Sequence, residues 1–145
     1  MRPALIGESG AFHIARPLRL LIVDDSAVTR AMIKGTLERE PDFEIVGSVG
    51  SADQALELLA ERRVDIVLLD LDMPGIDGFT ALPAIRAQGQ GAQVIVVSAS
   101  CTEGSKVSAR ARALGAIETY AKPLARDMGP GFAAGLRDRL RRIGY

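Results

Sequence analysis

The sequence predicts an α/β domain with a parallel sheet, because short apolar runs and helix-like patterns alternate along most of the chain. The runs are rich in Val, Ile and Leu, as expected for strands that helices cover on both faces. Between them, apolar residues recur at the spacing of one helix face. The expected strands are 18–24, 43–49, 65–69, 93–98 and 117–121, and the expected helices are 27–40, 52–62, 79–88, 103–114 and 132–143.

Local signals justify the first half of this assignment. Apolar residues recur at helical spacing in the first expected helix (Val28, Met32, Ile33 and Leu37), and Pro41 ends that helix. Ser51 precedes the next helical pattern and is a suitable N-cap for it. The run that follows, 65–69, is continuously apolar after Asp65, which is typical of a strand that helices cover on both faces.

The second half follows the same rhythm. Turn-forming residues crowd 72–78, and a helix with Pro83 near its first turns comes next. Gly115 closes the fourth helix before the last strand. Right-handed crossovers leave few topologies for such a chain, and the flavodoxin-like strand order 2-1-3-4-5 is the commonest for five strands. We therefore expect a flavodoxin-like, doubly wound sheet flanked by five helices.

Composition narrows the class of protein. The 145 residues suit one domain, residues 18–145, preceded by a flexible N-terminal arm, 1–17, that lacks the apolar core of a signal peptide. Basic and acidic residues balance at 18 each, so overall charge favours neither nucleic acid nor a membrane surface as a partner. The single cysteine, Cys101, excludes an internal disulfide and suggests the cytoplasm, and the only histidine, His13, lies in the arm.

Polar residues follow four of the five expected strands. The first strand ends at Asp24 and Asp25, the third at Asp70 and the fourth at Ser98, and Lys122 follows the fifth. Each group alone has an ordinary explanation as a helix cap or a turn residue. However, ligands of open parallel sheets bind beyond the carboxyl ends of the strands, so these groups are expected to form one site.

The chemistry of that site follows from its charges. Three neighbouring carboxylates repel one another unless a cation joins them, and an oxygen-only donor set suits Mg²⁺. A carboxylate can act as a nucleophile toward a phosphoryl group, while an ammonium and a hydroxyl can each hold one phosphoryl oxygen. These groups together predict phosphoryl transfer onto Asp70.

The sequence contains four motifs at the expected strand ends: VDDS at 23–26, LLDLDMPGIDG at 68–78, VVSAS at 96–100 and AKP at 121–123. Together they resemble the motifs of the receiver domains of two-component response regulators. The match covers about 18–144, and the closest likeness within the family is to the receiver of the chemotaxis methylesterase. The catalytic half of that enzyme has no counterpart in this sequence, so the chain is expected not to be an enzyme in its own right; it is either an isolated regulatory domain or a stand-alone regulator.

The resemblance implies a role for each matching residue. Asp70 would be phosphorylated, and the metal would be bound directly by Asp25 and through water by Asp24. Asp72 would offer the metal its backbone carbonyl. Ser98 would provide the hydroxyl that takes part in the phosphorylation switch, and Lys122 would be the lysine that is characteristic of the family. Pro123 would follow a cis peptide bond.

One position departs from the family. Receivers usually carry Tyr or Phe three residues before the lysine, but this chain has Thr119 there and Tyr120 one step later. Successive residues of a strand face opposite sides, so Tyr120 is not expected to replace the missing aromatic. In the receiver family, the switch hydroxyl and the aromatic ring move together upon phosphorylation. The departure at Thr119 leaves the acceptor chemistry intact but calls that coupled movement into question for this chain.

The resemblance also implies partners. A histidine kinase or a phosphotransfer protein would supply the phosphoryl group. Phosphorylation would then switch a surface of the chain that binds an output protein, which the sequence does not name. Chemotaxis is one process in which this could occur. Two other readings stay open. A receiver-like interaction module that is never phosphorylated would explain Thr119, and a phosphatase of the haloacid dehalogenase type would explain the D-x-D pattern of Asp70 and Asp72.

Overall fold

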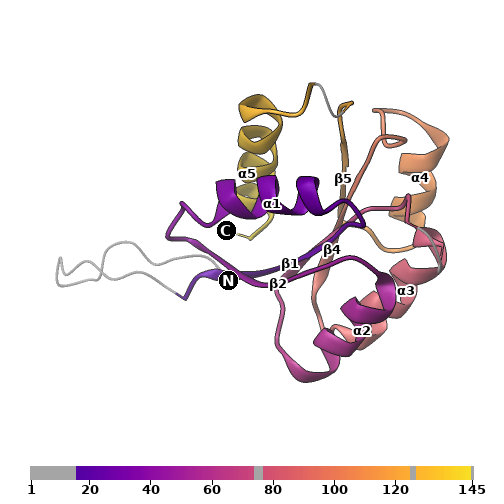
Figure 1. Cartoon of the computed structure of the whole chain (residues 1–145). Helices are drawn as coiled ribbons and strands as arrows, with labels where there is room; N and C mark the ends of the chain where they lie inside the picture. Colours follow the sequence, from indigo (N-terminus) through magenta and orange to yellow (C-terminus); the bar gives the residue numbers. More distant parts are fainter. Residues whose placement is uncertain (1–15, 74–76, 125–126, 145) are drawn as a thin grey trace, which may run out of the picture.

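The five strands form one parallel sheet in the order β2-β1-β3-β4-β5, as predicted (Figure 1). The computed structural model describes residues 16–73, 77–124 and 127–144. The N-terminal arm expected over 1–17 therefore lies, for residues 1–15, outside the described residues. The strands are β1 (Leu18–Val23), β2 (Phe43–Val49), β3 (Ile66–Leu69), β4 (Gln93–Ser98) and β5 (Glu118–Ala121). The helices are α1 (Ala27–Leu37), α2 (Ala52–Glu61), α3 (Gly78–Gln88), α4 (Lys106–Ala113) and α5 (Pro130–Gly144).

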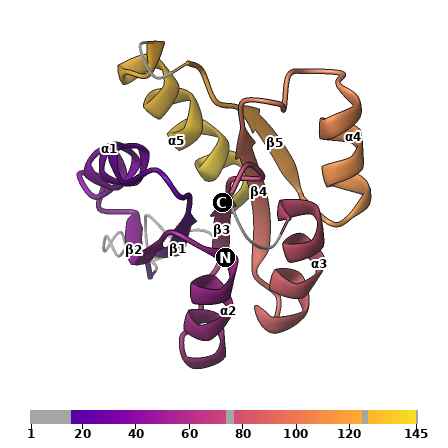
Figure 2. The ribbon, with the colours of Figure 1, turned by 45° about the vertical axis from the view of Figure 1, so that its right-hand side comes forward.

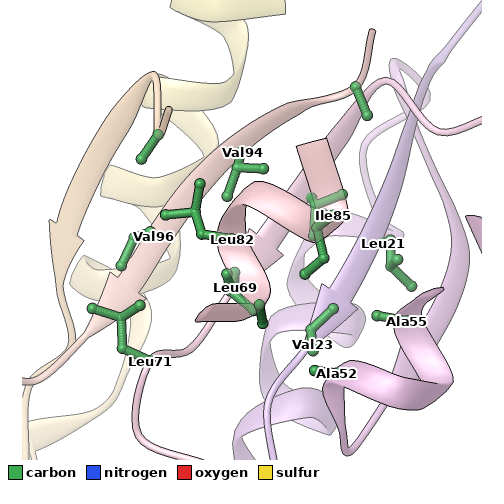
Figure 3. Packing of buried hydrophobic residues seen from close by; sticks show 14 of the residues in the cluster. Leu21, Val23, Ala52, Ala55, Leu69, Leu71, Leu82, Ile85, Val94 and Val96 are labelled. Atoms are coloured by element: carbon green, nitrogen blue, oxygen red, sulfur yellow. The ribbon is translucent and has the colours of Figure 1, made fainter. Parts of the chain in front are cut away.

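Helices cover both faces of the sheet, which explains the uninterrupted apolar runs in its central strands (Figure 2). Alternate residues of β1 point to opposite faces: Leu21 packs with α2 and α3, whereas Leu20 and Ile22 pack with α1 and α5. Figure 3 shows the first of these layers, in which Leu82 and Ile85 of α3 lie against the sheet. The register of the sheet pairs Val23 with Leu69 and Leu69 with Val96, so these strands reach the same edge of the sheet.

Some element bounds differ from the predicted ones. Helix α4 begins at Lys106 instead of 103, because the Ser105 side chain accepts from the backbone N–H of Ser108 and caps the helix there. Helix α5 begins two residues earlier than predicted, at Pro130, which suits the first turn because it has no N–H to leave unpaired.

The helices differ in how much they bury. Helix α5 buries three large side chains, Phe132, Leu136 and Leu140, whereas α4 fully buries only Ser108 and Ala111. Among the described residues, no helix is long and apolar enough to cross a membrane.

Candidate functional site

The backbone brings the predicted site residues to one edge of the sheet. Asp24 and Asp70 directly follow β1 and β3, and the backbone N–H of Asp70 donates to the carbonyl of Val23 at 2.9 Å. On the other side, the N–H of Lys122 donates to the carbonyl of Ser98 at 3.0 Å. The ladder between neighbouring strands thus extends into the site and fixes the backbone from which each functional side chain projects.

Three carboxylates form the centre of this edge. Asp24, Asp25 and Asp70 each offer an oxygen, and these atoms lie within 4.8 Å of one another. Asp24 and Asp70 are buried, while Asp25 is exposed. A ligand can therefore approach from the solvent on the Asp25 side and reach the two buried carboxylates.

Lys122 supplies a positive charge to the two buried carboxylates. Its Nζ lies 2.9 Å from Oδ2 of Asp24 and 3.2 Å from Oδ2 of Asp70. Burial lowers the pKa of Lys122, but the hydrogen bond to Asp24 and the charges of Asp70 and Asp24 outweigh it and raise the pKa above its ordinary value. The ammonium therefore stays protonated at neutral pH.

Asp70 has a raised pKa. Burial is the main cause, since it disfavours the charged carboxylate, and the neighbouring Asp24 charge adds to it. The backbone N–H of Asp72, at 3.1 Å from Oδ1, and the Lys122 ammonium act in the opposite direction. A further cation at this site would favour the ionised, nucleophilic form of Asp70.

The two carboxylate oxygens and the backbone carbonyl of Asp24 all accept hydrogen bonds. One carboxylate oxygen accepts from the N–H of Ser26 at 2.8 Å and the other accepts from Lys122. Its carbonyl accepts from the guanidinium of Arg30 on α1, a contact that sequence reasoning missed. The only available signal was the position of Arg30 one helical turn after the Ser26 cap, and that spacing does not predict which group the side chain contacts.

Ser98 is completely buried, and its hydroxyl contacts the loop that follows the acceptor. The hydroxyl donates to Oδ2 of Asp72 at 2.8 Å. Sequence reasoning assigned the backbone carbonyl of Asp72 to the metal and did not predict the contact of its carboxylate with Ser98.

Thr119 and Tyr120 face opposite sides of the sheet, as the alternation of a strand predicts. The Thr119 hydroxyl donates to Oγ of Ser108 on α4 at 3.3 Å. The Tyr120 hydroxyl donates to the carbonyl of Phe132 on α5 at 2.9 Å, and the two rings stack with their centroids 5.2 Å apart. Tyr120 is thus part of the α5 layer.

The expectation of a cis peptide bond before Pro123 is wrong for this structure. The described residues contain no cis bond, so the bond between Lys122 and Pro123 is trans. An X–Pro bond prefers trans by about 0.5–1 kcal/mol unless tertiary contacts favour cis. That expectation came from the resemblance alone, and the Lys-Pro dipeptide itself contains no signal for cis.

The donor set fits a hard divalent cation. All three side chains offer oxygen, the ligand that Mg²⁺ prefers, and no soft ligand belongs to the cluster found among the described residues. One ammonium faces three carboxylates, so the site retains an excess of negative charge when all of them are ionised. A divalent ion would remove that excess.

These features define a class of protein: a doubly wound α/β domain with an acidic cation site and a lysine at the carboxyl edge of its sheet. The family model for the response regulator receiver domain matches residues 20–128, and the chain belongs to this family. Receiver domains act in phosphorylation-based signalling, so the fold and the site agree with the family.

The chain is similar to protein-glutamate methylesterases and to solved receiver domains of CheB and CheY proteins. A protein-glutamate methylesterase/protein-glutamine glutaminase 1 of Paramagnetospirillum magneticum is 38% identical over 130 residues, which cover 88% of this chain and 34% of that protein. The response regulator domain of Thermotoga maritima CheB is 31% identical, with a TM-score of 0.79, and the match covers 88% of this chain and 96% of that one. The structure of the P1 domain of CheA3 in complex with CheY6 from R. sphaeroides matches at 32% identity and a TM-score of 0.74, covering 89% and 98%. The chain thus spans about a third of the methylesterase that it matches.

Proposed function

We propose that Asp70 accepts a phosphoryl group from a phosphohistidine on a partner protein, with Mg²⁺ bound by Asp24, Asp25 and Asp70. The observation that carries this proposal is the position of Asp70, which is buried between a second carboxylate and the Lys122 ammonium, at an edge that opens to solvent beside Asp25. A metal bound there would supply positive charge to the phosphoryl oxygens during the transfer.

The residues of the chain do the rest of the chemistry. A carboxylate oxygen of Asp70 attacks phosphorus, the phosphorus–nitrogen bond of the donor breaks, and its electron pair returns to the imidazole of the partner. Lys122 already lies 3.2 Å from Asp70 and balances the charge of the acyl phosphate. Ser98, on the adjacent strand, supplies a hydroxyl for one phosphoryl oxygen.

The partners follow from the relatives. A histidine kinase or histidine phosphotransfer protein in the cytoplasm is the proposed donor, since a similar receiver was solved in complex with a CheA P1 domain. Chemotaxis is the proposed process, and the output partner is a protein whose contact with the chain depends on phosphorylation. Methylesterase activity is not proposed for the chain, because the match covers only 34% of the relative.

Thr119 favours one alternative, an interaction module that works without phosphorylation. Its hydroxyl donates to Ser108, so the aromatic position of the family is occupied here by a small polar residue in contact with α4. Such a module would keep the fold and the surface without using the acidic site.

The intact mass of the protein after incubation with Mg²⁺ and acetyl phosphate tests the proposal. The wild-type chain is expected to gain one phosphoryl group, and Asp70→Asn is expected to gain none. Asp53→Asn, which changes an exposed carboxylate on α2, is the matched control and should behave as the wild type does. If neither an adduct nor a complex with beryllofluoride and Mg²⁺ forms, the chain is an unphosphorylated module.

A further inference from the structure

The hydroxyl of Ser98 has two hydrogen-bond partners in the structure. It donates to Oδ2 of Asp72 at 2.8 Å, and its oxygen accepts from the backbone N–H of Ser100 at 3.3 Å. A serine hydroxyl has one proton to donate. In this conformation Ser98 therefore has no donor left for a second acceptor.

Asp72 connects the acceptor to the switch hydroxyl. Its backbone N–H donates to Oδ1 of Asp70 at 3.1 Å, while its carboxylate reaches Ser98 on the next strand. Asp72 is exposed, whereas Asp70 and Ser98 are buried at 2% and 0% exposure. The carboxylate can therefore be hydrated after it releases the hydroxyl, and the contact can break without leaving a buried charge unpaired.

We propose that the Asp72 carboxylate holds Ser98 in a resting position and competes with the phosphoryl group on Asp70 for the single hydroxyl proton. The inference rests on the proposed function, because it assigns a regulatory contact to the same site. The Ser98–Asp72 hydrogen bond exists only in the resting protein, and a Ser98–phosphoryl hydrogen bond replaces it after transfer.

Electrostatics drives the exchange. The phosphoryl group brings about 1.5–2 negative charges to a position next to the Asp72 carboxylate, and like charges at this distance repel. The same charge makes the phosphoryl oxygens strong acceptors for Ser98. Asp72 thus makes the resting state more stable and raises the free energy needed to reach the switched state.

A double-mutant cycle separates this contact from a simple charge effect. Asp72→Ala removes the competitor and also one negative charge, and both changes should tighten the binding of beryllofluoride with Mg²⁺. In the Ser98→Ala background, only the charge effect remains. The affinities of the wild type, the two single variants and the double variant are measured by calorimetry. Glu103→Ala, at an exposed position before α4, is the control for loss of a carboxylate elsewhere on the surface.

The expected result is that Asp72→Ala tightens binding about three- to tenfold more when Ser98 is present than when it is absent, which corresponds to the net contribution of a typical protein hydrogen bond. In the metal-free protein, Asp72→Ala should also move the amide resonances of Ser98 and Ser100. Equal tightening in both backgrounds would overturn the contact as a regulator while leaving the proposed function intact. A wild-type protein that binds no beryllofluoride would overturn the proposed function and this contact with it.

Discussion

Replacing Lys122 by methionine is expected to destabilise the metal-free protein strongly at neutral pH and weakly in acid. The change keeps the apolar stem of the side chain and removes the charge that lies 2.9 and 3.2 Å from two buried carboxylates. At an effective dielectric constant of about 20, one such pair contributes about 5 kcal/mol of attraction, part of which offsets the desolvation of the charges. Removing one partner of a buried ion pair costs about 3–5 kcal/mol.

Protonation of Asp70 limits that cost. Without Lys122 the variant can bind a proton at Asp70, whose pKa is already raised by burial. Starting from the ordinary value of about 3.9, neutralising a carboxyl costs about 5 kcal/mol at pH 7.5 but only about 1.5 kcal/mol at pH 5. A carboxyl with a raised folded-state pKa destabilises the protein above that pKa, so the loss caused by Lys122→Met must shrink as the pH falls.

Urea unfolding followed by far-ultraviolet circular dichroism measures this effect in EDTA at pH 7.5 and 5.0, since the chain has no tryptophan. We expect a loss of about 3–5 kcal/mol at pH 7.5, about 1–2 kcal/mol at pH 5.0, and partial recovery with Mg²⁺ at pH 7.5. Lys106→Met, at an exposed position on α4, should change stability by less than about 0.5 kcal/mol. A loss of the same size at both pH values would refute the reasoning.

Three further predictions concern the fold around the site. The guanidinium of Arg141 donates a hydrogen bond to the carboxylate of Asp42 and holds the pKa of Asp42 below its ordinary value. The stability gained from this pair is therefore present above about pH 4 and is lost as the pH falls further. Arg141→Gln should flatten the decline of the free energy of unfolding between about pH 5 and pH 3 in urea titrations, and an unchanged slope would contradict this prediction. A Cβ at Gly78 would lie 2.6 Å from Cα of Leu71, so Gly78→Ala should lower the thermal midpoint and weaken Mg²⁺ binding; a wild-type affinity would show that the loop after Asp70 tolerates the shift. Tyr120→Phe removes one hydrogen bond to α5 and should lower the free energy of unfolding in urea by about 1 kcal/mol, while phosphorylation is retained. A variant that takes up no phosphoryl group would show that Tyr120 does more than pack against α5.

The sequence predicts the sheet and the acidic edge well because both depend on short-range patterns. Continuous apolar runs identify the buried strands, and the residue that follows each run must lie at the carboxyl edge once the strands are parallel. This reasoning places Asp24, Asp70 and Lys122 in one site without any knowledge of side-chain conformation.

Contacts that depend on side-chain conformation could not be predicted. The reach of Asp72 to Ser98 joins residues 26 positions apart and depends on a loop conformation for which the sequence has no periodic signal. The contact between Arg30 and the Asp24 carbonyl is of the same kind. At Pro123 the resemblance predicted a structural feature that is absent, because the peptide bond between Lys122 and Pro123 is trans and not cis.

The small buried area of α4 has a consequence for local unfolding. Proteins open in segments whose opening free energies follow the number of buried apolar contacts that each segment makes. Helix α4 has only Ser108 and Ala111 fully buried, so it is expected to open far more often than α5, which is anchored by Phe132 and Leu136. In hydrogen exchange the amides of α4 should exchange before those of α5, so the more readily opened of these two helices is the next element after the strand that ends at Ser98.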